Sequence, residues 1–359
     1  MKSLGGRVRK EHILTLGFLL ILLCLIYLIE EGYLFDSYFS RIIKLSVTYA
    51  IAAISMNLIN GMTGQFSLGQ AGFMAVGAYI TGLLIIPPDS KQLQFFITPI
   101  APWVRDLHAP FIVAIIIGGI FAAFFAFLIG FPVLRLKSDY LAIATLGFSE
   151  IIRVTAVNAP SITNSSLGLK NIPPIANLWW CIGTLAVIAY LVLKLMKTTH
   201  GRSFKAIRDD ETAAEAIGIN LFKQKLTSFI ISGFIAGISG GLLASVVGVI
   251  TPPYFKFTLA NEILLIVVLG GMGSITGSIV AATALTAGRE FLRILDDGFS
   301  LGPLTVKGVP GMRMLVFSVL LMVVVLFFNE GFFGAKEFSW KGLGSIFKKL
   351  KIPRKELKK

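Results

Sequence analysis

The stretch Asn60–Leu84, "NGMTGQFSLGQAGFMAVGAYITGLL", places a glycine or a small polar residue every few positions. The surrounding chain is strongly apolar, with 55% hydrophobic residues, 14% charged residues and a mean hydropathy of +0.81 over 359 residues. Soluble domains carry about 25% charged residues, so this chain is an integral membrane protein. Because glycine and amide side chains disfavour a helix interior, the stretch predicts a helix that is broken or tightly packed at membrane depth.

Apolar runs follow one another closely and predict an all-α polytopic membrane protein with about eight to ten transmembrane helices. The runs are 13–29, 42–59, 71–86, 111–134, 140–157, 178–195, 226–250, 263–286 and 312–328. We expect one transmembrane permease domain at 13–330, between a basic N-terminus at 1–12 and a basic tail at 331–359. Runs shorter than a full crossing are expected to be tilted or discontinuous.

The net charge of +14 is concentrated in three segments. Four of the 33 Lys and Arg residues lie in 2–10, seven in 194–225 and nine in 336–359. The positive-inside rule assigns all three segments to the cytoplasm, so nucleic acid is not expected as a partner. Nine simple crossings would put the two termini on opposite sides, so one run must enter and return or cross as two half-helices.

Two glycine-broken segments are candidates for the run that enters and returns or crosses as two half-helices. One is the opening stretch, and the other is Val267–Ser278, "VVLGGMGSITGS". Their short likeness, in two halves of the chain, is typical of transporters with internal repeats. Because the likeness is short, the sequence is compatible both with a true internal repeat and with two unrelated glycine-rich segments.

Polar residues in the first broken segment are candidates for a translocation path. Irregular backbone at membrane depth survives only where it is buried in protein or lines a wet cavity. Neutral side chains in such a cavity would offer hydrogen bonds without trapping a substrate. The candidates are Asn57, Asn60, Gln65, Ser67 and Gln70. The alternative is close helix packing, in which small residues let helices approach and polar side chains bond between them.

An ionisable pair lies in the segment "DYLAIATLGFSEIIRV". Glu150 and Arg153 are three residues apart, so they share one helix face and can form an intramembrane ion pair. Such residues are functional candidates by default. The alternative is a structural pair close to the outer end of the span that reaches the headgroups.

Signatures of catalysis and metal binding are absent from the sequence. Cys24 and Cys181 each lie within an apolar run, and the three histidines are far apart. No G-x-x-x-x-G-K-[ST] phosphate loop occurs, so an ATP-driven transporter would need its ATPase in another chain. We therefore expect a transport subunit rather than an enzyme, with no metal and no cofactor in this chain.

The polar segment Lys197–Leu226 is too long for a turn and predicts a structured loop. Ser203 is expected to cap a helix that runs through Ala216–Ile217, with Gly218 as its stop and Asn220 starting the next element. One small, mildly apolar side of that helix would carry Ala206, Ile207, Asp210, Ala213, Ala214 and Ile217. This side suits insertion into a groove of another protein. The alternative is an amphipathic helix lying on the membrane surface.

Five stretches, in this order, resemble the membrane permeases of branched-chain amino acid ABC importers, specifically the LivM-type subunit. They are "GMTGQFSLGQAGFMAVGAYI", "LRLKSDYLAIATLGFSEIIRV", "GRSFKAIRDDETAAEAIGINLFKQKLTSF" with "SGFIAGISGGLLA", "EILLIVVLGGMGSITGSIVAA" and "NEGFFG". Together they cover most of the chain from about Asn57 to Gly334. The resemblance implies a permease subunit for branched-chain or other neutral amino acids in a bacterial or archaeal plasma (inner) membrane.

The same resemblance implies partners and a coupling loop at 197–225. The partners would be a LivH-type sister permease, two ATP-binding subunits that hold ATP-Mg, and an extracytoplasmic substrate-binding protein. By the match to the family's coupling loop, the residues expected to meet the ATPase are Arg208, Glu211, Ala213, Ala214, Glu215 and Gly218. The I-x-L-P ending of the general ABC loop is missing after Gly218. Urea or short amides remain an alternative cargo, and an ATP-independent secondary transporter remains an alternative function.

Overall fold

A computed structural model describes residues 24, 26–32, 37–96, 98–135, 138–297, 299–301 and 304–306, with a few positions between 311 and 334. Most of the apolar runs 13–29 and 312–328 therefore lies outside the described residues. The basic N-terminus at 1–12 and nearly all of the basic tail at 331–359 also lie outside them, so expectations about those segments stay predictions.

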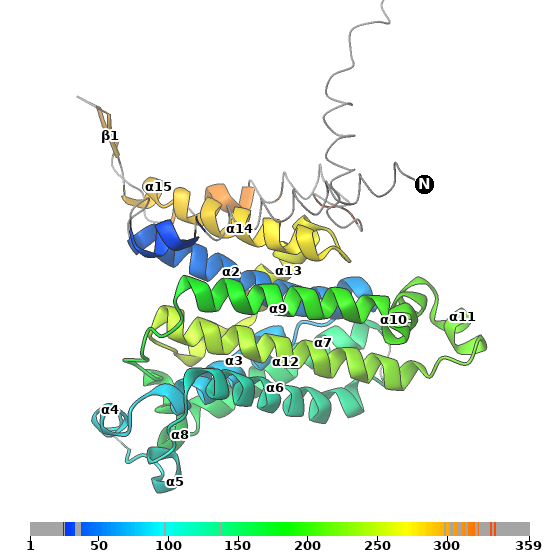
Figure 1. Cartoon of the computed structure of the whole chain (residues 1–359), viewed down its shortest axis with the longest axis horizontal. Helices are drawn as coiled ribbons and strands as arrows, with labels where there is room; N and C mark the ends of the chain where they lie inside the picture. The colour runs from blue at the N-terminus through cyan, green and yellow to red at the C-terminus, as the bar shows by residue number, and fades with distance from the viewer. Residues whose placement is uncertain are drawn as a thin grey trace, which may run out of the picture.

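The described part of the chain is a bundle of long apolar helices that lie side by side (Figure 1). The main helices are α2 (Ser37–Asn57), α3 (Gln70–Ile85), α6 (Phe111–Val133), α7 (Ser138–Val157), α9 (Leu178–Lys197), α12 (Leu221–Val247), α13 (Phe257–Gly270) and α14 (Ile275–Phe291). Five helices are long and apolar enough to cross a membrane, α2 together with its π-helical extension η1 (Leu58–Met62) being one of them. A sixth crossing results if α3 and the short α4 (Pro88–Gln94), bent by 117° from it, form one broken span.

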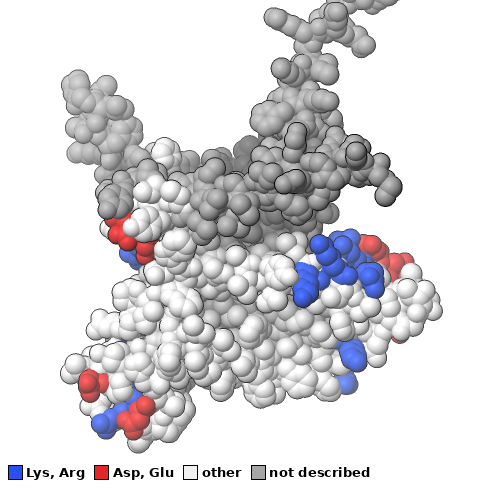
Figure 2. Space-filling view, in the orientation of Figure 1, with Lys and Arg blue, Asp and Glu red and all other residues white. Residues whose placement is uncertain are grey.

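Short elements close the two ends of the bundle. They are α5 (Pro102–Arg105), α8 (Pro160–Thr163), η2 (Ser165–Leu167), α10 (Thr199–Asp209), α11 (Glu211–Ala216), η3 (Pro252–Phe255), α15 (Ile294–Asp297) and the antiparallel pair β1 (Phe299–Leu301) and β2 (Leu304–Val306). We call the end that carries α10 and α11 the α11 end, and the end that carries α4, α5 and α8 the α4 end (Figure 1). Among the residues drawn in colour or white, charged side chains on the visible face gather toward the ends and are absent from the middle, as expected for a protein that crosses a membrane (Figure 2).

The apolar run 263–286 is two helices rather than one. The chain turns at Gly271 and Gly273, whose φ angles of +103° and +95° favour glycine. Next to the turn, a Cβ atom added at Gly270 would lie 2.5 Å from the carbonyl carbon of Gly277, so α13 and α14 touch backbone to backbone. At the other end of the hairpin, Arg289 pairs with Glu262 at 2.9 Å. The run therefore forms a hairpin of two helices, while the number of crossings expected from the charge distribution stays a prediction.

Helices α3, α6 and α12 form the most tightly packed part of the bundle. A Cβ atom at Gly77 of α3 would overlap the carbonyl oxygen of Gly237 in α12, and one at Gly240 would overlap that of Met74. A Cβ atom at Gly118 of α6 would lie 2.9 Å from the carbonyl oxygen of Gly77. Small residues let helices in a membrane approach closely enough for dispersion contacts to hold them together. The glycines of the opening stretch that lie within α3 are thus explained by packing.

A buried lysine organises the α4 end. Lys91 of α4 is 1% exposed, and its Nζ donates to the carbonyl oxygens of Val104 at 3.3 Å, Arg105 at 3.5 Å and Leu107. Burial lowers the pKa of Lys91, and the nearby Asp106 carboxylate opposes that shift. The ammonium group satisfies carbonyls at the end of α5 that have no helical partner, and it ties α4 to α5.

We expect Gly77→Ala to destabilise the protein, because the added methyl group would force α3 away from α12. Overpacking of this kind costs about 1–3 kcal/mol. Gly147→Ala in α7 is the matched control, since a Cβ atom there meets nothing within 4 Å. Thermal unfolding of both variants in detergent measures the difference. Equal midpoints for the two variants would contradict the packing role of Gly77.

Candidate functional site

The two glycine-broken segments meet inside the protein. A Cβ atom at Gly61 in η1 would overlap the backbone nitrogen of Gly273, and it would lie 3.0 Å from the carbonyl carbon of Met272. No residue larger than glycine fits at position 61. The two segments that the sequence singled out separately are therefore one structural feature, which we call the paired break: residues 57–69 together with 271–278.

Asn57 holds the two halves of the paired break together. Its Oδ1 accepts from the Gly273 N–H at 2.7 Å, and its Nδ2 donates to the Ser274 carbonyl oxygen and the Ser278 hydroxyl, both at 2.9 Å. The side chain is fully buried. One amide thereby bonds to three polar groups of the interrupted α13–α14 connection, at a depth where lipid offers no hydrogen bonds.

The first half of the paired break also satisfies itself. Asn60 bonds both ways to the backbone of Ser67: its Oδ1 accepts from the Ser67 N–H at 3.1 Å, and its Nδ2 donates to the Ser67 carbonyl oxygen at 3.3 Å. The Gln65 N–H donates to the Ile59 carbonyl oxygen at 3.0 Å, and Gly64 turns the chain with a φ of +74°. A loop that leaves the helix therefore keeps most of its backbone bonded.

Ser55, Gln70 and Ser232 form a buried cluster between α2, α3 and α12. The Ser232 hydroxyl donates to the Ser55 carbonyl oxygen at 2.7 Å, and Gln70 Nε2 donates to Ser232 Oγ at 2.9 Å. The Ser55 hydroxyl lies 3.0 Å from Gln70 Oε1. Interhelical bonds of this kind link helices in a membrane. Ser55 and Ser232 were not among the residues singled out from the sequence.

All five candidate path residues are buried within this chain. Asn57, Ser67 and Gln70 have no exposed surface, while Gln65 is 3% and Asn60 is 8% exposed. Gln65 Nε2 donates to Ser228 of α12 at 3.0 Å, so this residue too bonds between segments. Their burial favours the helix-packing alternative, and a role in lining a path stays a prediction.

The loop at the α11 end consists of two short helices rather than one. Thr198 precedes α10 and caps it, and Asp210 caps α11 by accepting from the N–H groups of Thr212 at 2.8 Å and Ala213 at 3.0 Å. Gly218, with a φ of +85°, ends α11, and Asn220 caps α12 through the Lys223 N–H at 2.9 Å. The predicted stop at Gly218 and start at Asn220 are confirmed.

The expected cap at Ser203 and the expected single helix are wrong. Ser203 lies inside α10, and the extended backbone of Asp210 separates α10 from α11. The shared face predicted for 206–217 is therefore divided: Ile207 and Ala214 are buried, while Ile217 is 75% exposed. The missed signal is the sequence Asp-Glu-Thr, because an aspartate followed by an acidic first turn is typical of a helix start.

The proposed coupling residues occupy different positions in this loop. Arg208 donates to the Gly61 carbonyl oxygen at 3.4 Å and pairs with Asp209, and Glu211 pairs with Lys225 at 2.6 Å. Ala214 is buried, whereas Ala213, Glu215 and Gly218 are exposed. Figure 1 shows α11 projecting from the bundle, so its exposed side is accessible to another protein.

Helix α10 rests on the paired break. A Cβ atom at Gly64 would lie 3.0 Å from the Cα atom of Arg208, and Phe204 and Ile207 are buried beneath the helix. Together with the bond from Arg208 to Gly61, this places the loop in direct contact with the interrupted helix. A displacement of α10 would therefore act on the paired break without passing through another element.

Several ion pairs lie within the described part of the bundle, among them Lys44–Glu30 at 3.5 Å. Arg153 Nε donates to Glu150, as the i, i+3 spacing predicts, and the side chains are 21% and 44% exposed. Glu262 of α13 and Arg289 of α14 form a further pair, which the sequence analysis did not identify. This pair joins residues 27 positions apart, and local spacing gives no signal for such a contact.

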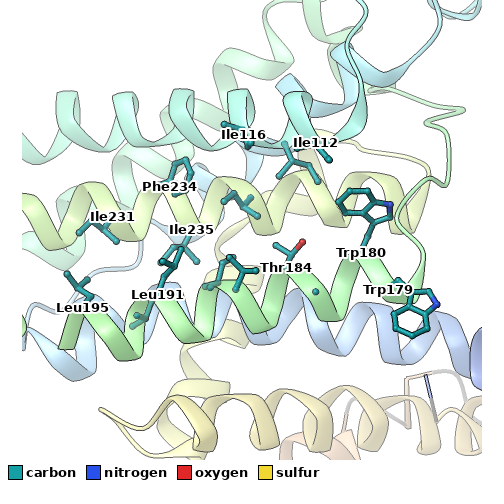
Figure 3. Close-up of a pocket in the computed structure, with 16 residues that line it drawn as sticks. Ile112, Ile116, Trp179, Trp180, Thr184, Leu191, Leu195, Ile231, Phe234 and Ile235 are labelled. Atoms are coloured by element: carbon teal, nitrogen blue, oxygen red, sulfur yellow. The ribbon is translucent and has the colours of Figure 1, made fainter. Parts of the chain in front are cut away.

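An apolar groove of about 800 Å³ lies between α6, α9 and α12 (Figure 3). Apart from Thr184 and the bare backbone of Gly183, its lining side chains are aliphatic or aromatic. Trp179 and Trp180 lie at the α4 end of the groove, where an aromatic belt is expected at the edge of a membrane. A polar solute finds few partners here, so the groove is not a candidate cargo site.

Comparison with known proteins places this architecture in a family. A family model described as the permease component of the branched-chain amino acid transport system matches residues 38–326. The chain belongs to this family. LivM of Escherichia coli (strain K12), named a high-affinity branched-chain amino acid transport system permease protein, is 30% identical over 331 residues, covering 83% of this chain and 72% of the relative. The LivM-type resemblance is confirmed.

Two further relatives show the breadth of the permease family. LivH of Salmonella typhimurium (strain LT2), named a permease protein of the same kind of transport system, is 25% identical over 263 residues, covering 68% of this chain and 81% of the relative. The L-arabinose transport system permease protein AraH of Escherichia coli (strain K12) is 29% identical over 211 residues, covering 55% of this chain and 60% of the relative. No solved structure matches the chain.

We expect Asn57→Leu to destabilise this permease more than a surface amide replacement does. The change removes the three hydrogen bonds of the Asn57 amide, and it takes from the buried Gly273 N–H the acceptor that Asn57 supplies. Each buried unpaired group costs on the order of 1–3 kcal/mol. Asn158→Leu is the control, because Asn158 is exposed and bonds only within its own helix end. Unfolding midpoints in detergent that fall equally would rule out the bridging role of Asn57.

Proposed function

We propose that this chain is one permease subunit of an ATP-driven importer for branched-chain or other neutral amino acids. The names of the LivM and LivH relatives support this cargo and support pairing with a LivH-type sister permease. Two ATP-binding subunits that hold ATP-Mg and an extracytoplasmic substrate-binding protein complete the proposed importer. The membrane is a bacterial or archaeal plasma membrane, with the α11 end and both termini on the cytoplasmic side.

The observation that carries this proposal is the contact between the projecting loop and the paired break. Helix α11 projects from the end of the bundle (Figure 1). Arg208 of the preceding helix α10 donates to the Gly61 carbonyl oxygen in the paired break. In the proposed mechanism, ATP closes the two ATPases, which move α11 and α10 and shift the membrane domain between inward and outward states. Nucleotide and the loaded binding protein supply the free energy, because each binds one state better than the other.

The proposed docking surface is the exposed side of α11. Ala213, Glu215 and Gly218 face solvent, and small residues suit insertion into a groove of a partner. The other three coupling residues connect α10 and α11 to the rest of the protein. Arg208 contacts the paired break, Glu211 pairs with Lys225, and Ala214 is buried. The six coupling residues thus divide into a contact group and a support group.

The cargo within the family is the less specific part of the proposal. Relatives named for branched-chain amino acids and for L-arabinose match the same chain, which fits a permease whose selectivity resides mainly in the binding protein. Urea and short amides are the alternative cargo. An ATP-independent secondary transporter is the alternative function, and it requires no ATPase contact at α11.

Purification of the tagged chain in mild detergent tests the proposal. We expect mass spectrometry to identify a second permease and two P-loop ATPases that co-purify with it. Recovery of this chain alone, under conditions in which a control importer stays whole, would favour a secondary transporter and remove the coupling role of α11.

A substitution at Gly218 tests the loop itself. Gly218→Asp places a charged side chain at a position with a φ of +85°, at the end of the docking surface. We expect ATP-driven uptake to fall at least about fivefold while membrane insertion is retained, since coupling free energies of about 1–3 kcal/mol are typical. Gly32→Asp is the control, because Gly32 also has a positive φ of +76° and open space around it. Normal uptake by the Gly218 variant would refute this account of the loop.

A further inference from the structure

Helix α7 presents one continuous stripe of exposed and half-buried residues. Its members recur at spacings of three and four residues and are Tyr140, Ile143, Gly147, Glu150, Ile151 and Val154. This α7 stripe is apolar except for the tyrosine hydroxyl and the Glu150 carboxylate, and Arg153 lies at its edge. An apolar helix face of a membrane protein normally contacts lipid, so the charged residues decide what this stripe faces.

The ion pair in the α7 stripe lies well below the end of the helix. Val157, the last residue of α7, follows Glu150 by seven positions, or about 10 Å of helix. Ser149 packs against α3, where a Cβ atom at Gly72 would lie 2.8 Å from the Ser149 Cα atom. Gly72 follows Gln70, which bonds to Ser232 near the middle of the 27-residue α12. Glu150 is therefore close to mid-depth in a hydrocarbon layer of about 30 Å.

Lipid is a poor neighbour for this part of α7. A charged side chain near the bilayer centre costs at least about 2.5–3.5 kcal/mol, and such residues face the bundle interior or water. Glu150 is 44% exposed in this chain, so the bundle does not enclose it. Side chains of a helix lean toward its N-terminus, which for α7 is the α11 end. The Arg153 side chain accordingly points toward the α11 end and donates to Glu150. It does not point toward the α4 end, which is closer along the helix and where it could reach headgroups.

We propose that the α7 stripe faces a water-filled path between this chain and the sister permease, and that Glu150 and Arg153 meet the charged groups of a zwitterionic solute there. The carboxylate suits an ammonium group, and the guanidinium suits a carboxylate group. Because the two side chains neutralise each other, the path carries no net charge at this level that would trap the solute. This inference rests on the proposed function and adds the wall of the path and the class of cargo.

Cysteine accessibility in the assembled importer tests the position of the α7 stripe. The background is Cys24→Ser with Cys181→Ala, which removes both native thiols. Gly147→Cys reports on the stripe one turn from the ion pair and leaves the pair intact. Gly183→Cys in the apolar groove is the matched control, since added side chains at both glycines meet nothing within 4 Å. The probe is a membrane-impermeant, positively charged methanethiosulfonate applied to proteoliposomes.

We expect the thiol at position 147 to react at least about tenfold faster than the thiol at 183, because hydrocarbon excludes a charged reagent. The comparison is stringent, since Gly183 is only five residues from the start of α9, whereas Gly147 is ten residues from the end of α7. Equal, slow reaction at both positions in an importer that assembles and transports would overturn the inference and leave the proposed function standing. Failure to recover any sister permease would overturn both.

The role of the pair is tested by removing both charges together. Glu150→Gln with Arg153→Gln leaves no single charge behind, so the importer is expected to assemble, which co-purification of the sister permease checks. We expect uptake of leucine to fall about tenfold. Normal leucine uptake by the double variant would overturn the contact with the solute.

Discussion

The constraint on which this structure depends is the absence of water at membrane depth. A helix that stops there exposes N–H and C=O groups that lipid cannot satisfy. Two helical segments stop inside this bundle, at Gly61–Gly64 and at Gly271–Gly273, and they stop against each other. Asn57 lies at their junction with three hydrogen bonds. The paired break is stable because the protein itself supplies the partners that water would supply elsewhere.

The same constraint explains the backbone between η1 and α3. The N–H groups of Gln65, Ser67, Leu68 and Gly69 all have acceptors, from a backbone carbonyl, Asn60, Thr145 and the Ser67 hydroxyl respectively. Side chains supply three of these four acceptors, whereas a regular helix would use only carbonyl groups. The small polar residues of the opening stretch are thus structural necessities of a broken helix. The glycines of α3 answer a second requirement, the close approach of α6 and α12.

Sequence reasoning succeeded where the signal is local. Gly218 ends a helix and Asn220 begins one, because a positive φ and an N-terminal cap depend on the residue at that position. Glu150 and Arg153 pair because their spacing places them on one helix face. The glycines of the second broken segment likewise mark the turn at Gly271–Gly273, where the φ angles are positive.

It failed where partners are distant or where a cap was overlooked. The bond from Ser55 to Ser232 spans 177 positions, and no periodicity in either segment identifies the other. Gln65 and Gln70 likewise bond to residues of α12 more than 160 positions away. The break at Asp210 is locally encoded, since this aspartate caps α11, and the expectation of one continuous helix does not account for it. Polar residues in an apolar chain indicate that hydrogen-bond partners are needed at membrane depth. Only the tertiary structure shows whether the protein supplies those partners.

Burial of the broken segments has a consequence for how selectivity can arise. Asn57, Asn60 and Gln70 form hydrogen bonds within this chain, so few of their donors and acceptors are available to a solute. This burial supports the proposal that the path runs along an outer face of the bundle, with each permease contributing one wall. In that geometry the interior would transmit the movement of the loop, because α10 contacts the paired break. The outer faces would supply the side chains that contact the solute. A self-neutralising pair on such a wall would discriminate by charge pattern while leaving fine selection to the protein that delivers the cargo.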